Sequence, residues 1–172
     1  MGSNSTDNNF RKDENLLVKP GKKVNLKDFD TCYTANFKNK EDAAEMLAKD
    51  IARLAELQDM LYAMNKYSLL VVIQAMDAAG KDGTIKHVMT GVNPQGCNVT
   101  SFKQPSVEEL EHDFLWRVNR AMPKRGMIAI FNRSHYEEVL VTRVHPEYIL
   151  GQNIPGIDTV DKVDKKFWQK RY

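Results

Sequence analysis

The chain reads Leu69-Leu70-Val71-Val72-Ile73-Gln74-Ala75-Met76-Asp77-Ala78-Ala79-Gly80-Lys81-Asp82-Gly83-Thr84 near its centre, and this stretch decides the fold. Its first five residues are all apolar and rich in branched side chains, as is typical of a parallel strand buried on both faces. Small residues follow at once, and a helix is predicted from about Lys81 to Met89. The sequence therefore predicts a buried strand, a tight loop and a helix in immediate succession.

The loop of this unit has the properties of a phosphate-binding site. Gly80 and Gly83 let backbone amides approach an oxyanion, and the N-terminus of the following helix adds partial positive charge. Lys81 supplies a mobile charge that can bridge phosphates. Two positions depart from the pattern G-x-x-x-x-G-K-[ST]: Ala75 stands at the first glycine and Asp82 at the hydroxyl residue. A plain tight turn is the alternative interpretation.

The loop also contains a carboxylate, Asp77. A carboxylate here repels a phosphate unless it holds a cation or takes a proton, so we expect Asp77 to bind Mg²⁺, with activation of the attacking phosphate oxygen as a further role. An Asx turn is the alternative. Thr84 is the nearest hydroxyl to the loop. The predicted phosphate- and nucleotide-binding residues are Ala78, Ala79, Gly80, Asp82, Gly83, Thr84 and Asn132.

A second buried strand is predicted over Met127–Phe131, followed directly by Asn132 and Arg133. Phosphate-loop proteins place an acidic, metal-positioning residue at the end of such a strand. Asn132 is a neutral oxygen donor, so more of the charge balance of the metal falls on Asp77 and the phosphates. Arg133 is expected to stabilise charge on a transferring phosphoryl group, with a surface ion pair as the alternative. The predicted catalytic residues are Asp77, Lys81 and Arg133, and the predicted metal ligands are Asp77 and Asn132.

Other polar residues have open interpretations. His135 is interpreted as a packed or hydrogen-bonding residue and not as a catalyst. The loop Gly91–Gly96 either contacts an acceptor nucleotide or caps the preceding helix. Five cations are candidates for lining an anion path, with solvated surface as the alternative for each: Lys86, Lys103, Arg117, Arg120 and Arg143.

The rest of the chain predicts an α/β fold. Apolar residues recur at spacings of three and four from Leu47 to Leu61, which predicts a helix packed on the core or, alternatively, on another subunit. Ser106 and Glu109 form a capping box that starts another helix, ended by the turn at Pro123–Gly126. A last helix begins in Val160–Tyr172. Strands alternating with helices indicate a parallel sheet with helices on both faces.

Bulk properties limit the function. The net charge of the 172 residues is only +2, which argues against nucleic acid as a partner. No apolar stretch approaches the length of about twenty residues that spans a bilayer, so no membrane partner is expected. Cys32 and Cys97 match no metal or redox spacing and are interpreted as reduced thiols of a cytoplasmic protein.

The motifs together resemble the polyphosphate kinase 2 family. The loop is similar to the family pattern G-x-D-A-A-G-K-x-G-T, and the likeness extends from about Val18 to the last residue. The other motifs that carry it are Lys19-Pro20-Gly21-Lys22-Lys23-Val24, Leu26-Lys27-Asp28, Gly91-Val92-Asn93-Pro94-Gln95-Gly96, Phe131-Asn132-Arg133-Ser134-His135-Tyr136-Glu137 and Phe167-Trp168-Gln169-Lys170-Arg171-Tyr172. Ala75 departs from the usual Gly, and Glu138 stands where related sequences often have Asp.

This resemblance implies a P-loop kinase fold that transfers a phosphoryl group, with Mg²⁺, between inorganic polyphosphate and a nucleotide (AMP, ADP or ATP). It places Asp77 and Asn132 at the metal, and Lys81 and Arg133 on the phosphates. The run from Asn132 to Glu137 is closest to the branch that accepts both AMP and ADP, while other branches carry Asp at position 132. We expect residues 1–40 to form a polar tail and an extended arm, residues 41–172 a partial P-loop kinase core, and the protein to be a homo-oligomer.

Two further expectations concern length and alternatives. The chain shows two or three convincing strands, whereas open parallel sheets have about five, so the sheet is expected to be incomplete at the C-terminus. Family members continue into further strands and a basic lid, and a chain without them is expected to be poorly soluble or weakly active. The alternatives are an ATP-dependent nucleoside monophosphate or small-molecule kinase on the same fold and a non-catalytic anion-binding fragment.

Overall fold

A computed structural model describes residues 16–34 and 37–171. The predicted polar tip, residues 1–15, lies outside the described residues, as does Tyr172 of the closing motif. The chain divides into two compact units, Met1–Leu47 and Ala48–Tyr172, and the second is called the core unit below. In the first unit, Asn25 caps the 3₁₀ helix η3 (Leu26–Asp28) by accepting a hydrogen bond from the backbone N–H of Lys27.

The first long helix, α1, runs from Lys40 to Met64. It begins where the Asn39 side chain accepts a hydrogen bond from the backbone N–H of Asp42, at 2.8 Å. The predicted apolar stripe is only partly buried: Ile51 is half-buried, Leu57 is exposed, and the fully buried residue of this helix is Gln58. The helix was predicted correctly, and the described residues cover its apolar stripe only in part.

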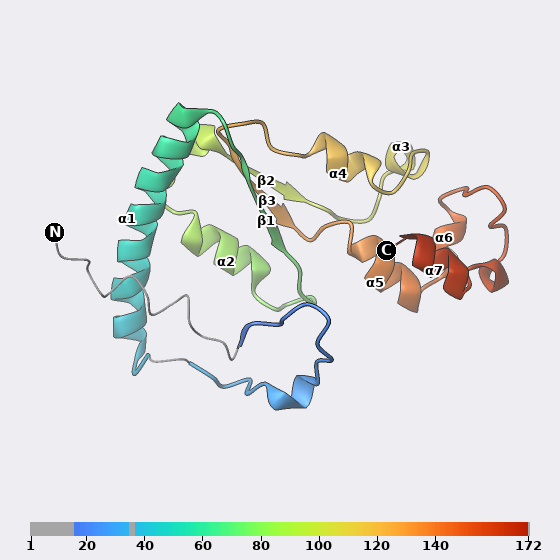
Figure 1. The fold of residues 1–172 in the computed structure, drawn as a ribbon, viewed down its shortest axis with the longest axis horizontal. Coiled ribbons are helices and arrows are strands. Elements are labelled where there is room, and N and C mark those ends of the chain that lie inside the picture. The colour runs from blue at the N-terminus through green and yellow to red at the C-terminus, as the bar shows by residue number, and fades with distance from the viewer. Residues whose placement is uncertain (1–15, 35–36, 172) are drawn as a thin grey trace. The chain divides into compact units, whose positions relative to one another are not determined.

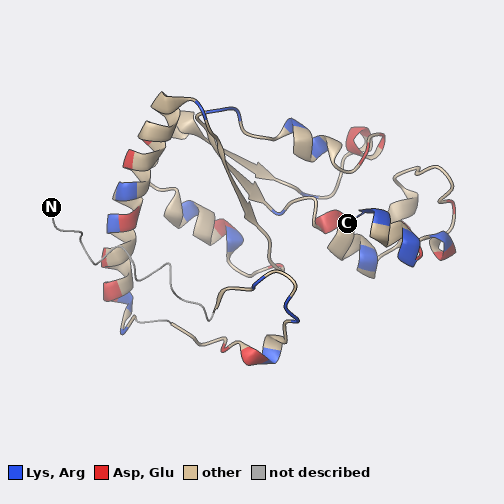
Figure 2. Ribbon diagram, viewed as in Figure 1, with Lys and Arg blue, Asp and Glu red and all other residues tan. Residues whose placement is uncertain are grey.

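The core unit is built on a parallel sheet of three strands, β1 (Leu69–Ile73), β2 (Cys97–Ser101) and β3 (Ile128–Asn132), in the order β1-β3-β2. Helices α2 (Lys81–Val88) and α4 (Trp116–Arg120) lie on opposite sides of this sheet (Figure 1). The predicted class, a parallel sheet with helices on both faces, is confirmed. Figure 2 shows both signs of charge spread over the helices, in keeping with the net charge of +2.

In the described sheet, the central strand β3 is the most buried, with four of its five residues buried. Ile128, Ala129, Ile130 and Phe131 of β3 are each buried, and Ala129 and Phe131 pack with Phe102 and Val118 in the hydrophobic core. Strand β1 was predicted to be buried on both faces, and this is wrong for the described residues: Leu69, Val71 and Val72 are exposed. The reason is that β1 is an edge strand of the described sheet, so its apolar run is covered incompletely.

The capping box is confirmed by two hydrogen bonds, from the Ser106 backbone N–H to Glu109 Oε2 at 2.8 Å and from the Glu109 N–H to Ser106 Oγ at 3.3 Å. The helix that it starts is short. α3 (Val107–Leu110) and α4 are separate, because the Asp113 side chain turns the chain by accepting a hydrogen bond from the backbone N–H of Leu115. The single helix predicted up to Pro123 is therefore wrong.

The C-terminal part of the core unit is helical (Figure 1). Its elements are α5 (Glu137–Val144), α6 (Glu147–Leu150), the 3₁₀ helix η5 (Val160–Lys162) and α7 (Lys165–Arg171); a further 3₁₀ helix, η4 (Pro94–Gly96), precedes β2. The predicted final helix is thus two pieces, and α7 starts where Asp164 accepts a hydrogen bond from the Phe167 N–H.

Candidate functional site

The loop between β1 and α2 turns through two left-handed residues. Gly80 has a φ of 88° and Ala78 a φ of 60°. Glycine adopts this conformation freely, whereas it is uncommon for an alanine. Gly80 is also the N-cap of α2, and since it has no side chain, no side-chain hydrogen bond caps the helix. The first amides of α2 are therefore available to an anion at the place where the helix carries partial positive charge.

Lys81 lies over this loop. Its Nζ donates to the carbonyl oxygens of Ala75 at 2.8 Å and Met76 at 2.7 Å. The ammonium thus holds the loop in a curl with its charge at the start of α2. A phosphate entering the loop would compete with these two carbonyls for the same donor.

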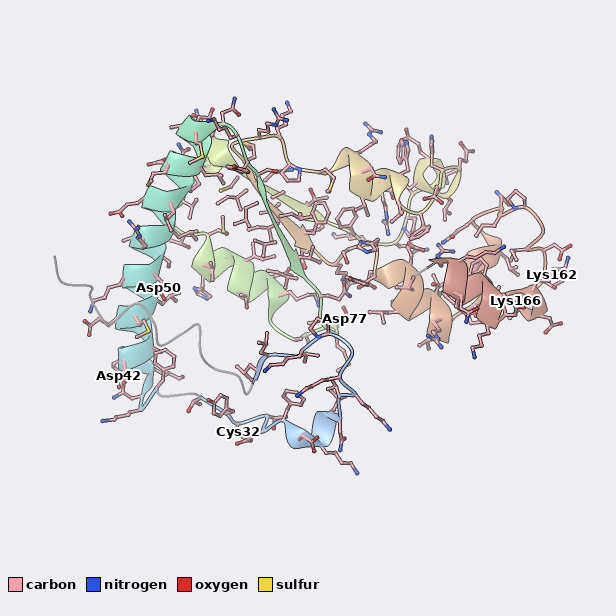
Figure 3. All side chains as sticks on the ribbon, viewed as in Figure 1. Cys32, Asp42, Asp50, Asp77, Lys162 and Lys166 are labelled. Atoms are coloured by element: carbon pink, nitrogen blue, oxygen red, sulfur yellow. The ribbon has the colours of Figure 1, made fainter. Side chains whose placement is uncertain are left out.

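Asp77 forms an ion pair with Arg133 across this curl. The Asp77 side chain is 87% exposed and that of Arg133 is 35% exposed, so the pair lies at the surface. Figure 3 shows Asp77 at the loop that follows β1. Arg133 has a φ of 67°, a left-handed backbone at the residue directly after β3. The structure therefore brings two of the predicted catalytic residues together, in the ion pair that was the alternative interpretation of Arg133.

Asn132 and Arg133 reach the loop because the strand ends are level. Asn132 pairs with Ile73 of β1 and with Ser101 of β2. The Arg133 backbone N–H donates to the Ile73 carbonyl at 2.9 Å, and the Phe102 N–H donates to the Asn132 carbonyl at 3.0 Å. Parallel strands expose their carboxyl ends at one edge, where α/β proteins bind ligands.

The Asn132 side chain contacts the second acidic residue of the motif. Its Nδ2 donates to Asp82 Oδ1 at 2.5 Å, which orients the amide and leaves its oxygen as a free acceptor in this pair. Thr84 is placed differently. Its hydroxyl donates to the Gly80 carbonyl at 3.1 Å, as a helical side chain often does, and the residue does not line the cavity described next.

These residues surround a cavity of about 600 Å³. All of the predicted site residues except Thr84 line it. The full lining is Asp77, Ala78, Ala79, Gly80, Lys81, Asp82, Gly83, Ser101, Phe102, Lys103, Gln104, Asn132 and Arg133. Ser101, Phe102 and Gln104 were not predicted, although their place at or just after the end of the parallel strand β2 was a signal that could have found them.

A second cavity, of about 970 Å³, shares part of this lining. Both cavities include Asp77, Phe102, Lys103, Gln104 and Arg133, so the two are neighbours at the strand ends. The larger one extends between α5 and α6, where Leu140, Val141 and Tyr148 give it apolar walls. Residues 91–96 line neither cavity, so the proposed nucleotide contact of that loop has no support from these two sites.

The other candidates divide between surface and core. Lys86, Arg120 and Arg143 line neither cavity. Lys103 lines both, whereas Arg117 lines the larger one but is buried, with its side chain only 7% exposed. His135 is half-buried and stacks on the Tyr136 ring at a centroid distance of 4.5 Å, a packed position as expected.

The donor set suits a hard cation that arrives with phosphates. In the parts of the chain that the structure describes, no group of three or more His, Cys, Asp and Glu residues could hold a metal ion. Mg²⁺ does not need one, because it is commonly held by one or two carboxylates together with water and substrate phosphates. The exposed Asp77 carboxylate and the Asn132 amide oxygen, both at the smaller cavity, fit that mode of binding.

No helix in the described ranges, 16–34 and 37–171, is long and apolar enough to cross a membrane.

Comparison with known proteins finds relatives whose names describe similar enzymes. The chain is 48% identical over 161 residues to an ADP-polyphosphate phosphotransferase of Rhodopseudomonas palustris, covering 94% of this chain and 55% of the relative. It is 47% identical over 156 residues to an AMP/ADP-polyphosphate phosphotransferase of Meiothermus ruber, covering 90% of this chain and 53% of the relative. The chain thus spans about half the length of these curated relatives.

A solved structure agrees. The crystal structure of polyphosphate kinase 2 from Arthrobacter aurescens TC1 superposes with a TM-score of 0.74 at 39% identity, covering 90% of this chain and 50% of that chain. The fold is thus that of an α/β protein whose parallel sheet carries the candidate site at the ends of its strands. Residues 37–153 match the family model of polyphosphate kinase 2 (PPK2), and the chain belongs to that family.

Proposed function

We propose that this protein transfers a phosphoryl group between inorganic polyphosphate and AMP or ADP. The family and the names of its relatives support the reaction class. The observation that carries the proposal for these residues is the convergence of Asp77, Lys81 and Arg133 on one cavity at the ends of parallel strands. Since the chain spans about half of its relatives, the proposal concerns what this segment contributes to the reaction.

Different groups of this chain are proposed to contact different parts of the phosphates. The free amides at the start of α2 receive phosphate oxygens. Lys81 leaves the Ala75 and Met76 carbonyls to contact bridging oxygens, and Arg133 leaves Asp77 to stabilise charge on the transferring group. Phosphoryl transfer depends mainly on such positioning and electrostatic stabilisation.

Mg²⁺ is part of the proposal, with Asp77 and Asn132 as the residues that would hold it. When bound, the cation would neutralise negative charge on the phosphate oxygens. The ion pair of Asp77 with Arg133 is consistent with this proposal, because Asp77 would hold the cation and the Arg133 guanidinium would contact phosphate.

The larger cavity is proposed to take the acceptor nucleotide. Its volume of about 970 Å³ is at the upper end of what small-molecule sites occupy, and apolar walls suit a base. It shares Asp77 and Arg133 with the phosphate cavity, so an acceptor phosphate could reach both residues. The choice between AMP and ADP stays open in the proposal, because the relatives named above differ in it.

A cytoplasmic location and assembly into a homo-oligomer complete the proposal. Cys32 and Cys97 are both free thiols, which fits a reducing compartment.

The proposal is tested by incubating the purified chain with long-chain polyphosphate, Mg²⁺ and either AMP or ADP, and separating the nucleotides by chromatography. Formation of ADP or ATP that is lost in Lys81→Met supports it. Transfer from ATP to a nucleoside or sugar, with no product from polyphosphate, would overturn it in favour of an ATP-dependent kinase. Polyphosphate binding without any turnover would instead indicate an anion-binding segment.

A further inference from the structure

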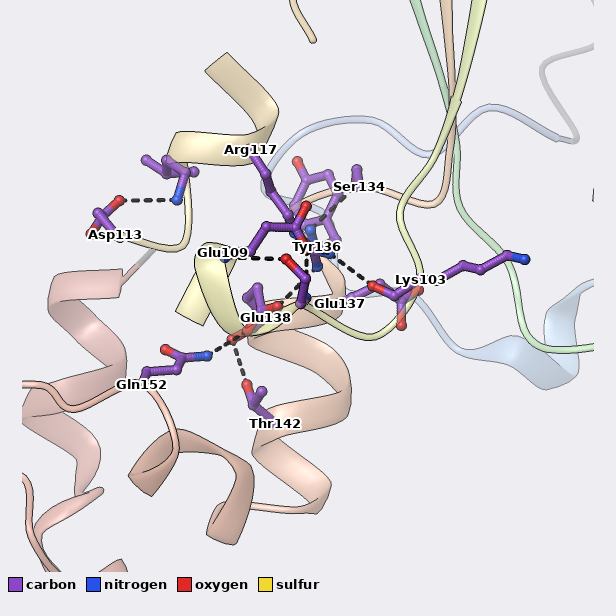
Figure 4. Close-up of polar contacts among 12 residues, drawn as sticks. Lys103, Glu109, Asp113, Arg117, Ser134, Tyr136, Glu137, Glu138, Thr142 and Gln152 are labelled. Atoms are coloured by element: carbon purple, nitrogen blue, oxygen red, sulfur yellow. Dashed lines mark hydrogen bonds and ion pairs between the residues drawn. The ribbon is translucent and has the colours of Figure 1, made fainter. Parts of the chain in front are cut away.

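Arg117 is a buried cation in a network of polar contacts (Figure 4), and it lines the larger cavity. Its Nη2 donates to Glu138 Oε1 at 3.1 Å, and its Nη1 lies 3.5 Å from Glu109 Oε2. The guanidinium also lies 5.5 Å from the centre of the Phe102 ring. With two carboxylates beside it and little exposure, the Arg117 guanidinium is paired within the protein, although the residue lines the larger cavity. The alternative of solvated surface is therefore wrong for this residue, and its part in an anion path stays a prediction.

Glu138, which is itself 4% exposed, connects Arg117 to the C-terminal helices. Its Oε2 accepts a hydrogen bond from Gln152 Nε2 at 2.7 Å and lies 3.7 Å from Arg171 Nη2. Arg171 also donates to Gln152 Oε1 at 2.7 Å. One carboxylate thus lies between two buried guanidinium groups from α4 and α7.

The network reaches the substrate cavities through a backbone atom. Arg117 Nη1 donates to the carbonyl oxygen of Lys103 at 2.8 Å. Lys103 itself is exposed, and it is a cation that lines both cavities. Lys103 lies in the segment between β2 and α3, which has no helical hydrogen bonds until α3 begins at Val107. The hydrogen bond from Arg117 therefore fixes the backbone of this segment at Lys103.

We propose that Arg117 and Glu138 are positioning residues, which hold the backbone of Lys103 so that its ammonium lies at the junction of the two cavities and contacts polyphosphate. Stability alone does not account for the network, since a buried ion pair is often no more stabilising than apolar residues of the same volume. A planar guanidinium can bind a carboxylate and a carbonyl at once and so fixes the orientation of both groups. An ammonium does not provide this planar geometry. The inference rests on the proposed function, because it names polyphosphate as the ligand.

The test is a double-mutant cycle on binding. Affinity for a polyphosphate of defined length, with Mg²⁺ present, is measured by calorimetry for wild type, Lys103→Met, Arg117→Lys and the double variant. Arg117→Lys keeps the charge next to Glu138 but cannot also reach the Lys103 carbonyl. Arg120→Lys is the matched control, because Arg120 lies on the same helix, stacks on Trp116 and does not line either cavity.

We expect Lys103→Met and Arg117→Lys each to weaken binding about tenfold, a loss of about 1.4 kcal/mol. The double variant is expected to be no weaker than Lys103→Met, because Arg117 acts through Lys103. Arg120→Lys should bind as wild type does. A purely structural role would lower the melting temperature of Arg117→Lys but would not make its binding effect vanish in the Lys103→Met background.

Wild-type affinity in Arg117→Lys, or losses that multiply in the double variant, would overturn the inference. If Arg117→Lys does not fold, Glu138→Gln, which has the same size and breaks the charged pair from its other side, takes its place in the cycle. Because binding is measured without turnover, an absence of phosphoryl transfer in all variants would count against the proposed function alone. A wild-type chain that does not bind polyphosphate would overturn both.

Discussion

The side-chain amide of Gln58 occupies the space into which a Cβ atom at Gly96 would project. Such an atom would lie 1.7 Å from Gln58 Nε2 and 2.8 Å from Cδ. Gln58 is 1% exposed, and its amide nitrogen and oxygen have no hydrogen-bond partner among the described residues. Glycine is needed at position 96 for room and not for a left-handed backbone, because its φ is not positive.

Gly96→Ala is therefore expected to destabilise the protein by about 1–3 kcal/mol, the usual cost of overpacking a core. Urea titration followed by circular dichroism measures the change. Gln58→Ala in the same chain should recover part of the loss, because it vacates the contested space. Gly83→Ala is the matched control, since nothing lies within 4 Å of a Cβ there. Equal unfolding midpoints for Gly96→Ala and wild type would contradict the prediction.

Asp77→Asn is expected to lower the rate of transfer from polyphosphate well over tenfold, because the amide holds a cation poorly and pairs weakly with Arg133. The Mg²⁺ concentration that gives half of the maximal rate should rise as well. Initial rates over a Mg²⁺ series measure both effects. A near-normal rate would show that Asp77 serves only to form the turn.

Removing the carboxylate at position 138 is expected to be costly. Glu138→Leu leaves the buried Arg117 and Arg171 without their shared partner, and breaking a buried pair in this way costs about 3–5 kcal/mol. Burial lowers the pKa of the Arg171 guanidinium, and the charge of Glu138 opposes that shift. Without Glu138, the charged form of Arg171 is therefore destabilised as well. The unfolding free energy is the measurement. Asp158→Asn, which breaks only the exposed pair with Lys162, should change nothing measurable, and a similar result for Glu138→Leu would refute the prediction.

Cys97 is expected to react slowly with thiol reagents near neutral pH. Burial raises the pKa of its thiol above the usual value, and the thiolate is the reactive form. Because the pKa of this thiol is higher in the folded state, the contribution of Cys97 to the free energy of unfolding is complete below the pKa of the unfolded thiol. That contribution is lost as pH rises through the higher pKa of the folded state. Alkylation rates from pH 7 to 10 test this, with Cys97→Ser reporting the exposed Cys32 alone. Equal rates for the two thiols at pH 7.5 would contradict it.

The strand–loop–helix unit could be predicted because its signals are local. The apolar run of β1, the small residues after it and the lysine that starts α2 are consecutive in the chain. The capping box at Ser106 is local as well, and both of its hydrogen bonds are present. The site residues at the end of β3 followed from topology, because a parallel sheet brings the ends of its strands to one edge.

What the sequence did not reveal depends on distant partners. Arg117 was interpreted as a surface or anion-path cation because nothing near it in sequence marks it as buried; its partner Glu138 lies 21 residues away. Gln74 is similar. Its amide donates to Glu137, the first residue of α5, at 2.6 Å and accepts from the buried Ser134, so the start of the loop contacts residues that lie 63 and 60 positions further along the chain. Helices α5 and α6 were not predicted, and the division between α3 and α4 depends on a single turn at Asp113.

Within the described sheet, strand β3 lies between β1 and β2 and pairs with both, and this has a consequence for the tolerance of the chain to insertions and deletions. The turn at residues 123–127 joins α4 to β3 at the far end of the strand from Arg133, yet one added residue there could slide β3 by one place against both neighbours. Side chains alternate along a strand, so such a slip would exchange the residues that face each side of the sheet and move Asn132 and Arg133 past the loop in a single step. Natural variation in the length of this turn should therefore be rarer than variation in its residues.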